Sequence, residues 1–237
     1  MSVETLLSDL FPAGHSVRVE GELLLGTGRT SRGEVDVVGV TGGAEVGVEQ
    51  ALRLAGAVLA TVRDHPGRPL LALLDSRGQR MSLRDEILGL NGCLAHLAAC
   101  MELARQKGHR LVGLVTGNAA SGSALALGFM ADEVHALPEA HPWVMSLEAM
   151  SRVTKIPLER LEELSRGSAV LAQGLPSFLR LGAIESTWTS PLSAPLEAAL
   201  ARPAGPDVRA LRGRERGGRV VAAAVADAVA GGGPGAA

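Results

Sequence analysis

Cysteine, tyrosine and long uncharged stretches are scarce or absent in this sequence. Its 237 residues include two cysteines, three phenylalanines and no tyrosine. Cys93 and Cys100 fall in one expected helix, where two turns separate their backbones by about 10 Å, so these thiols cannot form a disulfide with each other. We expect both to be reduced. The scarcity of aromatics, beside abundant Ala, Gly and Arg, indicates a compositional bias and not a function.

Membrane, nucleic-acid and metal signatures are also missing. No stretch of about 18 apolar residues is free of charge, and the beginning of the chain lacks a basic segment followed by an apolar run. The formal net charge of −2 gives no overall attraction to nucleic acid or anionic membranes. His65, His109 and His135 have no cysteine or acid at the spacing of a metal site. The sequence therefore predicts a soluble, cytoplasmic protein that binds no membrane, nucleic acid or metal ion.

Strand and helix patterns alternate through most of the chain. Strands are expected at Glu22–Leu25, Val35–Val40, Leu70–Asp75, 110–117, 134–137 and 143–145. Helices are expected at Val48–Arg63, at Leu83–Lys107, from Ser123 onward, and at 146–155, 157–167 and 176–183. Such alternation is typical of βαβ units with parallel strands, so we expect an α/β fold.

Composition divides the chain into four segments. We expect an N-terminal extension at 1–17, a main domain at 18–190, a C-terminal helical segment at 191–230 with one amphipathic helix at Arg219–Ala230, and a disordered tail at 231–237.

Two loops rich in small residues follow expected parallel strands. One reads DSRGQRMS after Leu74, and the other reads TGNAASGS after Val115. The carboxyl ends of parallel strands meet at one edge of a sheet, where ligands bind. Small side chains leave backbone N–H groups accessible, and two such donors aimed at one oxygen form an oxyanion hole. The alternative is that Gly117 and Gly122 only permit a tight turn and close helix packing.

These residues resemble the crotonase-like acyl-thioester enzymes through VTGNAASGSALALGFMAD. The closer resemblance is to the γ subunits of biotin-independent malonate decarboxylases, relatives of biotin-dependent carboxyltransferases. It rests on LLALLDSRGQRMSLRDE, LNGCLAHLAACMELAR, GNAASGSALALGFMAD and SRVTKIPLERLEELS, and extends over much of residues 20–188.

The resemblance implies a crotonase-like (ClpP/crotonase) spiral of ββα units and a hetero-oligomer with a β subunit. It also implies decarboxylation of a malonyl thioester to the acetyl thioester on an acyl-carrier subunit. That carrier would supply a prosthetic thiol arm of the phosphoribosyl-dephospho-CoA type, and this chain would bind no cofactor of its own.

The resemblance also assigns residues to the expected site. The Gly122 N–H, with its neighbour Ser121, would stabilise the enolate oxygen, and Gly78 or Gln79 would supply a second donor. Substrate or carrier contacts would come from Gly117, Asn118, Ser123, Ser76, Arg77 and Arg80. Arg77 and Arg80 are either solvated surface charges or ligands of the malonyl carboxylate or the carrier's phosphates. Ser121-Gly122-Ser123 replaces the consecutive glycines of many crotonase-like enzymes, which leaves side-chain chemistry open.

Two other functions are compatible with these residues. Gly117 to Ser121 also fit the nucleophile turn of Clp-type serine proteases, and His141 follows at a suitable distance for a Ser–His pair that forms an acyl-enzyme. The chain could instead be a non-catalytic structural subunit of a carboxyltransferase complex.

Overall fold

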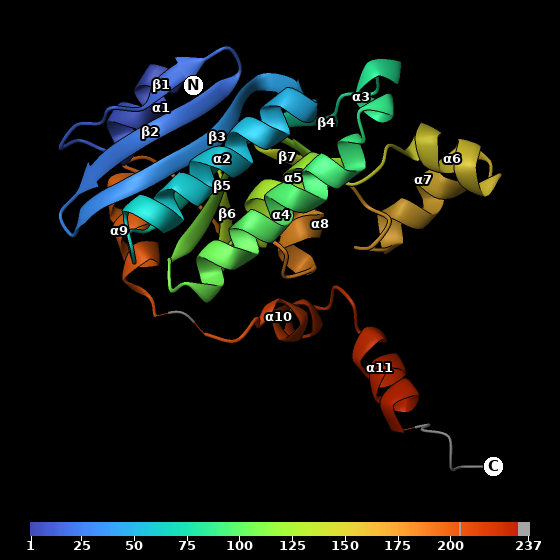
Figure 1. Ribbon diagram of the computed structural model, residues 1–237. Coiled ribbons are helices and arrows are strands. Elements are labelled where there is room, and N and C mark those ends of the chain that lie inside the picture. Colours follow the sequence, from blue (N-terminus) through green and yellow to red (C-terminus); the bar gives the residue numbers. More distant parts are fainter. Residues whose placement is uncertain (204, 232–237) are drawn as a thin grey trace. The chain divides into compact units, whose positions relative to one another are not determined.

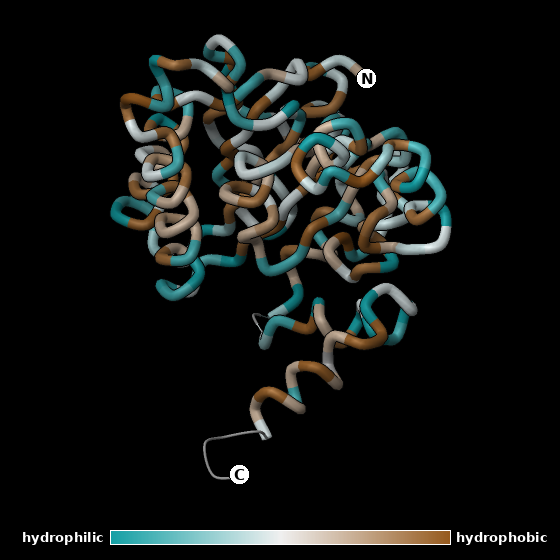
Figure 2. The backbone as a smooth tube through the Cα atoms, turned by 90° about the vertical axis from the view of Figure 1, so that its right-hand side faces the viewer, coloured by the Kyte–Doolittle hydropathy of each residue, from teal (hydrophilic) through white to brown (hydrophobic). Residues whose placement is uncertain are grey.

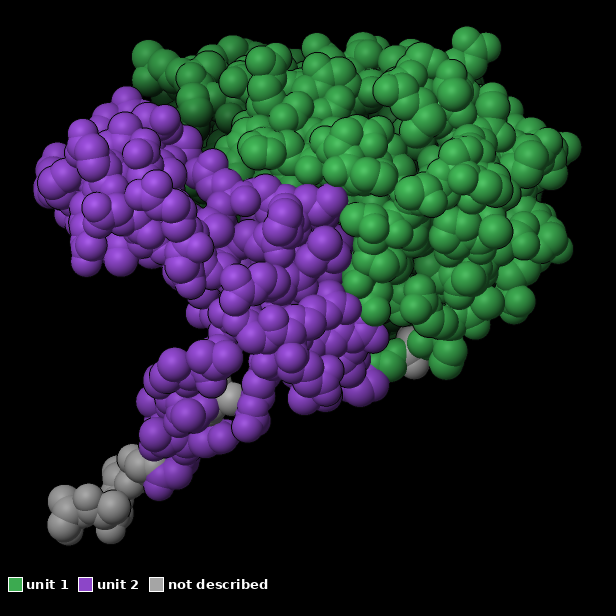
Figure 3. Space-filling view, turned by 180° about the vertical axis from the view of Figure 1, so that it is seen from behind, with its two compact units in different colours: residues 1–145, 185–205 green, residues 146–184, 206–237 purple. Residues whose placement is uncertain are grey.

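The computed structural model describes residues 1–203 and 205–231. They belong to two compact units, each built from two separate stretches of the chain (Figure 3): residues 1–145 and 185–205 in unit 1, and 146–184 and 206–237 in unit 2. The segment boundaries expected from composition remain predictions, and most of the expected C-terminal tail lies outside the described residues.

Unit 1 contains the sheet and the helices that cover it. Its elements in chain order are α1 (Val3–Leu10), β1 (Arg18–Glu20), β2 (Leu23–Thr30), β3 (Gly33–Val46), α2 (Val48–Asp64), β4 (Leu70–Gln79), α3 (Leu83–Ile87), α4 (Leu90–Gln106), β5 (Leu111–Ala120), α5 (Ser121–Leu127), a 3₁₀ turn η1 (Gly128–Met130), β6 (Glu133–Ala136), β7 (His141–Trp143), β8 (Ser186–Thr187) and α9 (Ser193–Ala201).

Unit 2 is helical in its described residues. It consists of α6 (Leu147–Thr154), α7 (Leu158–Gly167), α8 (Leu175–Arg180), α10 (Arg209–Glu215) and α11 (Ala222–Gly231). The expected amphipathic helix is α11, in which Val225 and Val229 are exposed and which shows hydrophobic colouring in Figure 2. No helix in the described residues is long and apolar enough to span a membrane.

The sheet is antiparallel at its start and parallel beyond. Its strand order is β1-β2-β3-β4-β5-β6-β8, and β7 also pairs with β5. The first three strands pair antiparallel, whereas every pairing from β3 onward is parallel. The expected parallel βαβ organisation is therefore confirmed for the part of the sheet that follows β3, where helices return the chain between strands.

Apolar side chains fill both faces of the sheet. Helices α2 and α4 lie side by side across one face in Figure 1. On the opposite face α1 and α9 pack with strand residues in one buried cluster, which includes Leu6, Leu10, Leu73, Leu114, Leu196 and Leu200. A parallel strand covered on both faces needs consecutive apolar residues, and Leu70–Leu74 is buried along its whole length. The expected N-terminal extension thus contributes α1 to this core.

Two expectations about local structure are wrong. The long helix expected at Leu83–Lys107 is divided into α3 and α4, because Gly89 takes a left-handed conformation with φ of 79° that no regular helix accommodates. The two expected loops are largely strand, because β4 continues to Gln79 and β5 to Ala120. Register shifts beside both extensions explain why their sequences resemble loops.

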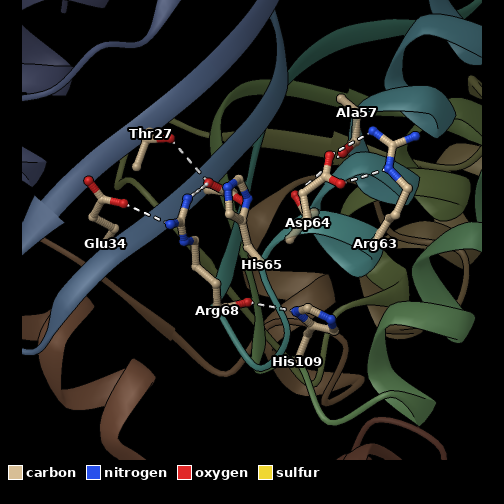
Figure 4. Close-up of polar contacts among 10 residues, drawn as sticks. Thr27, Glu34, Ala57, Arg63, Asp64, His65, Arg68 and His109 are labelled. Carbon is tan, nitrogen blue, oxygen red and sulfur yellow. Dashed lines mark hydrogen bonds and ion pairs between the residues drawn. The ribbon is translucent and has the colours of Figure 1, made fainter.

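Polar and charged side chains gather around the buried Asp36 carboxylate where the parallel strands begin. The Asp36 carboxylate accepts hydrogen bonds from Thr27 and Arg68 and lies 3.1 Å from the His65 ring. Figure 4 shows Arg68 also reaching Glu34, and His109 approaching the Arg68 carbonyl oxygen. These hydrogen bonds and the ion pairs of Arg68 link β2, β3 and the segment before β4 at the edge opposite to the two small-residue segments.

A second buried group surrounds His135 on β6. Its ring stacks on Trp188, with 4.4 Å between ring centroids, and its two nitrogens lie near Ser186 and Glu133. Burial lowers the pKa of His135 to about 4, although the Glu133 carboxylate opposes the shift. The ring is therefore neutral in the folded protein at neutral pH.

We expect this neutral histidine to make folding pH-dependent. Histidine in an unfolded chain has a pKa of about 6.5. As the pH falls from about 6.5 towards 4, His135 binds a proton in the unfolded chain and stays neutral in the folded one, so the unfolding free energy decreases. The loss should approach about 3 kcal/mol of unfolding free energy. Urea unfolding at pH 7, 6, 5 and 4 measures it. His135→Phe keeps a ring against Trp188, and its unfolding free energy should change less with pH. Equal changes with pH in the two proteins would show that His135 is not the source of the effect.

Candidate functional site at the carboxyl ends of β4 and β5

The extensions of β4 and β5 bring the two small-residue segments into contact. A methyl group added to Gly78 would lie 3.6 Å from Ser121 Cβ and 3.7 Å from its hydroxyl oxygen. Gly78 has a φ of 119°, which side chains rarely adopt, so glycine suits this position for its backbone as well as for its size. The expected meeting of these two segments at one sheet edge is confirmed.

Ser121 occupies a strained turn between β5 and α5. Its φ of 54° is left-handed, an uncommon conformation for a residue with a side chain. The strain is offset in part by its hydroxyl, which donates a 2.8 Å hydrogen bond to the Val144 carbonyl oxygen. Strain of this kind gathers at functional turns. The N–H of the next residue, Gly122, faces Gln79 on β4.

The Gly122 N–H points at an oxygen of the carbonyl type. It donates a 3.2 Å hydrogen bond to Gln79 Oε1, an amide oxygen at the end of β4. A thioester oxygen is an acceptor of the same kind, and the oxyanion role expected of this N–H remains a prediction. Of the two residues expected to supply the second donor, Gly78 directs its N–H to Ser76 Oγ at 3.2 Å.

Three of the residues expected to contact substrate or carrier, Ser76, Ser123 and Gly117, also contact other residues of the protein. Ser76 and Ser123 are buried, their hydroxyl oxygens are 3.2 Å apart, and Ser76 also donates to the Ala44 carbonyl oxygen. Gly117 is small because the Asp75 side chain fills its place; an added methyl would come within 2.6 Å of Asp75 Cγ. The side chains of these two serines therefore support the strand ends, and the contacts to substrate or carrier expected of them and of Gly117 remain predictions.

Arg77, Arg80 and Asn118 lie around the same edge. Arg77 is exposed and its Nε donates to the Gly43 carbonyl oxygen at 2.8 Å. Arg80 reaches the Glu45 carbonyl oxygen at 3.4 Å. The Asn118 side chain donates to Asp75 at 3.2 Å. The guanidinium groups thus stand near the strand ends and retain further donors for an anion.

Asp85 fixes the start of α2 beside this edge. Its carboxylate accepts hydrogen bonds from the Val48 N–H at 2.8 Å and from the Ser82 hydroxyl at 2.5 Å. The Ser82 hydroxyl, followed by the Val48 N–H, lowers the pKa of Asp85 below its usual range. Asp85 therefore stays ionised and serves as a structural anchor for the segment that follows β4.

Ser121 and His141 do not form a nucleophile pair. The Ser121 hydroxyl hydrogen is directed to the Val144 carbonyl oxygen, whereas the His141 ring contacts Trp143 at 5.2 Å between centroids. A serine hydrolase needs the hydroxyl to donate to the histidine ring. This geometry disfavours the Clp-type alternative.

The described residues contain no group of three or more His, Cys, Asp or Glu side chains that could hold a metal ion. Cys93 and Cys100 are both free thiols, as their spacing predicts.

Asp75 is the residue of this edge that the sequence reasoning missed. Its only signal was its place directly after a fully apolar strand.

Similarity to solved structures defines the class of fold. A chain of transcarboxylase 12S superimposes with a TM-score of 0.71 at 19% identity, covering 86% of this chain and 43% of that chain. A chain of a Pseudomonas malonate decarboxylase hetero-tetramer, solved in complex with coenzyme A, superimposes with a TM-score of 0.78 at 27% identity over 95% of this chain and 97% of that chain. The protein has the crotonase-like α/β fold of the carboxyltransferases, as expected.

Sequence comparison identifies the family within that class. Residues 41–232 match the malonate decarboxylase gamma subunit family, and the chain belongs to it. The malonyl-S-ACP:biotin-protein carboxyltransferase MADD of Malonomonas rubra is 35% identical over 149 residues, which are 59% of this chain and 51% of that protein. The aligned part thus spans about half the length of this relative.

Proposed function

We propose that this chain is the γ subunit of a cytoplasmic malonate decarboxylase and acts with a β subunit. The substrate is a malonyl thioester on an acyl-carrier subunit, and the product is the acetyl thioester. Membership of the malonate decarboxylase gamma subunit family supports this proposal most strongly. The hetero-tetrameric state of the Pseudomonas enzyme is the basis for proposing a partner subunit.

The proposed reaction requires the protein to stabilise negative charge on the thioester oxygen. Breaking the bond between the α-carbon and the carboxylate releases carbon dioxide and leaves an electron pair that spreads onto the thioester oxygen. A proton added at the α-carbon completes the acetyl group. Backbone N–H groups aimed at the thioester oxygen lower the energy of the intermediate enolate, and they act best when they are fixed before the reaction.

The start of α5 suits this demand. The Gly122 N–H already binds an amide oxygen, that of Gln79, and a thioester oxygen would replace it. Ser121, Gly78 and Gln79 complete the proposed donor site, with Asn118, Arg77 and Arg80 at its rim. The arginines would bind the substrate carboxylate or the phosphates of the carrier's prosthetic thiol arm, which belongs to the carrier and not to this chain.

Carbon dioxide release from a malonyl-carrier thioester tests the proposal. The assay compares this chain alone, its β-subunit partner alone and the two together, with Ser121→Ala in parallel. We expect activity only in the mixture and little loss in Ser121→Ala, because a backbone donor survives that substitution. Inactivity of every mixture, together with Ser121-dependent labelling by a serine-directed acylating probe, would instead establish the hydrolase.

A further inference from the structure

Asp75 stands where both neighbouring strands contain extra residues. On β5, Thr116, Gly117 and Asn118 lie between the residues paired with Leu74 and Ser76, so three residues oppose Asp75 alone. On β3, residues 41, 42 and 43 occupy the same place between the partners of Leu74 and Ser76. The sheet therefore bulges on both sides of one carboxylate.

The two oxygens of that carboxylate accept backbone N–H groups where the regular hydrogen bonding between strands is interrupted. Oδ2 accepts the Gly43 N–H at 2.9 Å, and Oδ1 accepts the Asn118 N–H at 2.9 Å and the Asn118 side-chain amide at 3.2 Å. Backbone donors in a bulge must find acceptors when they are shielded from water, and a carboxylate makes stronger bonds than a neutral acceptor.

The neighbouring glycines are explained by the same contact. Gly43 has a φ of 62°, which turns its N–H toward Asp75. Gly117 leaves the space into which the Asp75 carboxylate fits. Asn118 lies three residues before Ser121, so the bond to Asp75 is made on the stretch of β5 that leads into the strained turn and the Gly122 N–H.

We propose that Asp75 is a positioning residue for the oxyanion donor. By joining the backbones of β3 and β5 across β4, its carboxylate holds the end of β5 so that the Gly122 N–H faces the thioester oxygen. Asp75 does not touch the substrate. This inference rests on the proposed decarboxylation, but the hydrogen bonds on which it depends can be tested without it.

The first test is steady-state decarboxylation by the assembled complex containing Asp75→Asn. The amide keeps the volume but turns one acceptor into a donor that faces another N–H. We expect kcat to fall by about 10- to 100-fold with KM within about threefold, because misplaced donors cost turnover more than binding. Asp132→Asn is the matched control, since Asp132 accepts the Leu111 N–H at the opposite end of β5. It should retain the kcat of the unmodified complex.

Gly117→Ala tests the same contact from the other side. Its methyl group should displace the carboxylate and lower kcat as Asp75→Asn does, whereas in the Asp75→Ala background the methyl has room and should add little further loss. Unchanged kcat in folded Asp75→Asn, or independent losses that multiply in the Gly117→Ala, Asp75→Ala double variant, would overturn the proposal.

Amide hydrogen exchange separates this inference from the proposed reaction. In Asp75→Asn, exchange at the Gly43 and Asn118 amides should accelerate by about tenfold or more, whether or not the complex decarboxylates malonyl thioester. Failure of the unmodified complex to release carbon dioxide would overturn the proposed function, and with it the role of Asp75 in that reaction. Unchanged exchange at both amides would refute the Asp75 contacts themselves.

Discussion

Gly122→Pro is expected to lower kcat for decarboxylation by about 10²-fold or more in the assembled complex. Proline removes the N–H that now binds Gln79 Oε1, and a single oxyanion donor contributes this much in comparable sites. Gly122 lies in the first turn of α5, where helices tolerate proline because their first N–H groups have no partner within the helix. Carbon dioxide release under substrate saturation gives kcat directly.

Gly122→Ala is the matched control. It keeps the N–H, and its methyl would lie 3.4 Å from Gln79 Oε1 and 3.8 Å from Leu94 Cδ1, close to ordinary contact distances. We expect it to retain kcat within a few-fold. Equal losses in the alanine and proline variants would point to crowding instead of a lost donor. Full activity of a folded, assembled Gly122→Pro complex would remove Gly122 from the oxyanion site.

The largest loss of stability is expected from Glu133→Ala. Glu133 lies 2.7 Å from Arg110 and 2.7 Å from Arg202, and 3.3 Å from the His135 ring. The pairing with Arg110 is one of charge, because the buried Nη2 atom makes no well-directed hydrogen bond. Among the described residues, removing the carboxylate leaves Asp132, 3.6 Å away, as the remaining acidic partner of Arg110. Breaking a buried pair costs about 3–5 kcal/mol of unfolding free energy, which urea denaturation at pH 7 measures.

Arg202→Ala removes a different partner from the same carboxylate and serves as the comparison. The Arg202 side chain is 44% exposed, against 10% for Arg110, so water already screens its charge. We expect a loss of about 1 kcal/mol or less. If the two substitutions destabilised the protein equally, burial would not be the source of the Glu133 effect.

Much of the fold follows from local pattern. The uninterrupted apolar run Leu70–Leu74 predicts a strand buried on both faces, and the 3.6-residue spacing of apolar positions predicts α2 within one residue of its observed end. The break at Gly89 was missed, because a glycine within an apolar helical pattern is compatible with both a continuous and a divided helix. Helices α9 and α10 lie within the helical segment expected at 191–230, but their bounds are not predictable where Ala, Pro, Arg and Gly dominate the chain.

The segments of the proposed donor site were predictable in part for the same reason. Gly117, Gly122 and Gly78 are identifiable because small residues after apolar strands allow backbone N–H groups to approach a ligand. The sequence could not assign different tasks to them. Gly122 presents its N–H to an amide oxygen, whereas Gly117 makes room for the carboxylate of Asp75, a residue 42 positions earlier in the chain.

The sequence by itself determined the α/β class, the family resemblance and the edge of the sheet at which the two small-residue segments meet. These depend on periodicity and on local residue types, which neighbours in the chain specify. Only the tertiary structure decided that Asp75 joins β3 to β5, that Ser76 and Ser123 are buried, and that Ser121 donates to Val144 and not to His141. Each of these facts is a contact between residues distant in sequence, and such contacts exist only once strand register is set by the packing of the whole sheet.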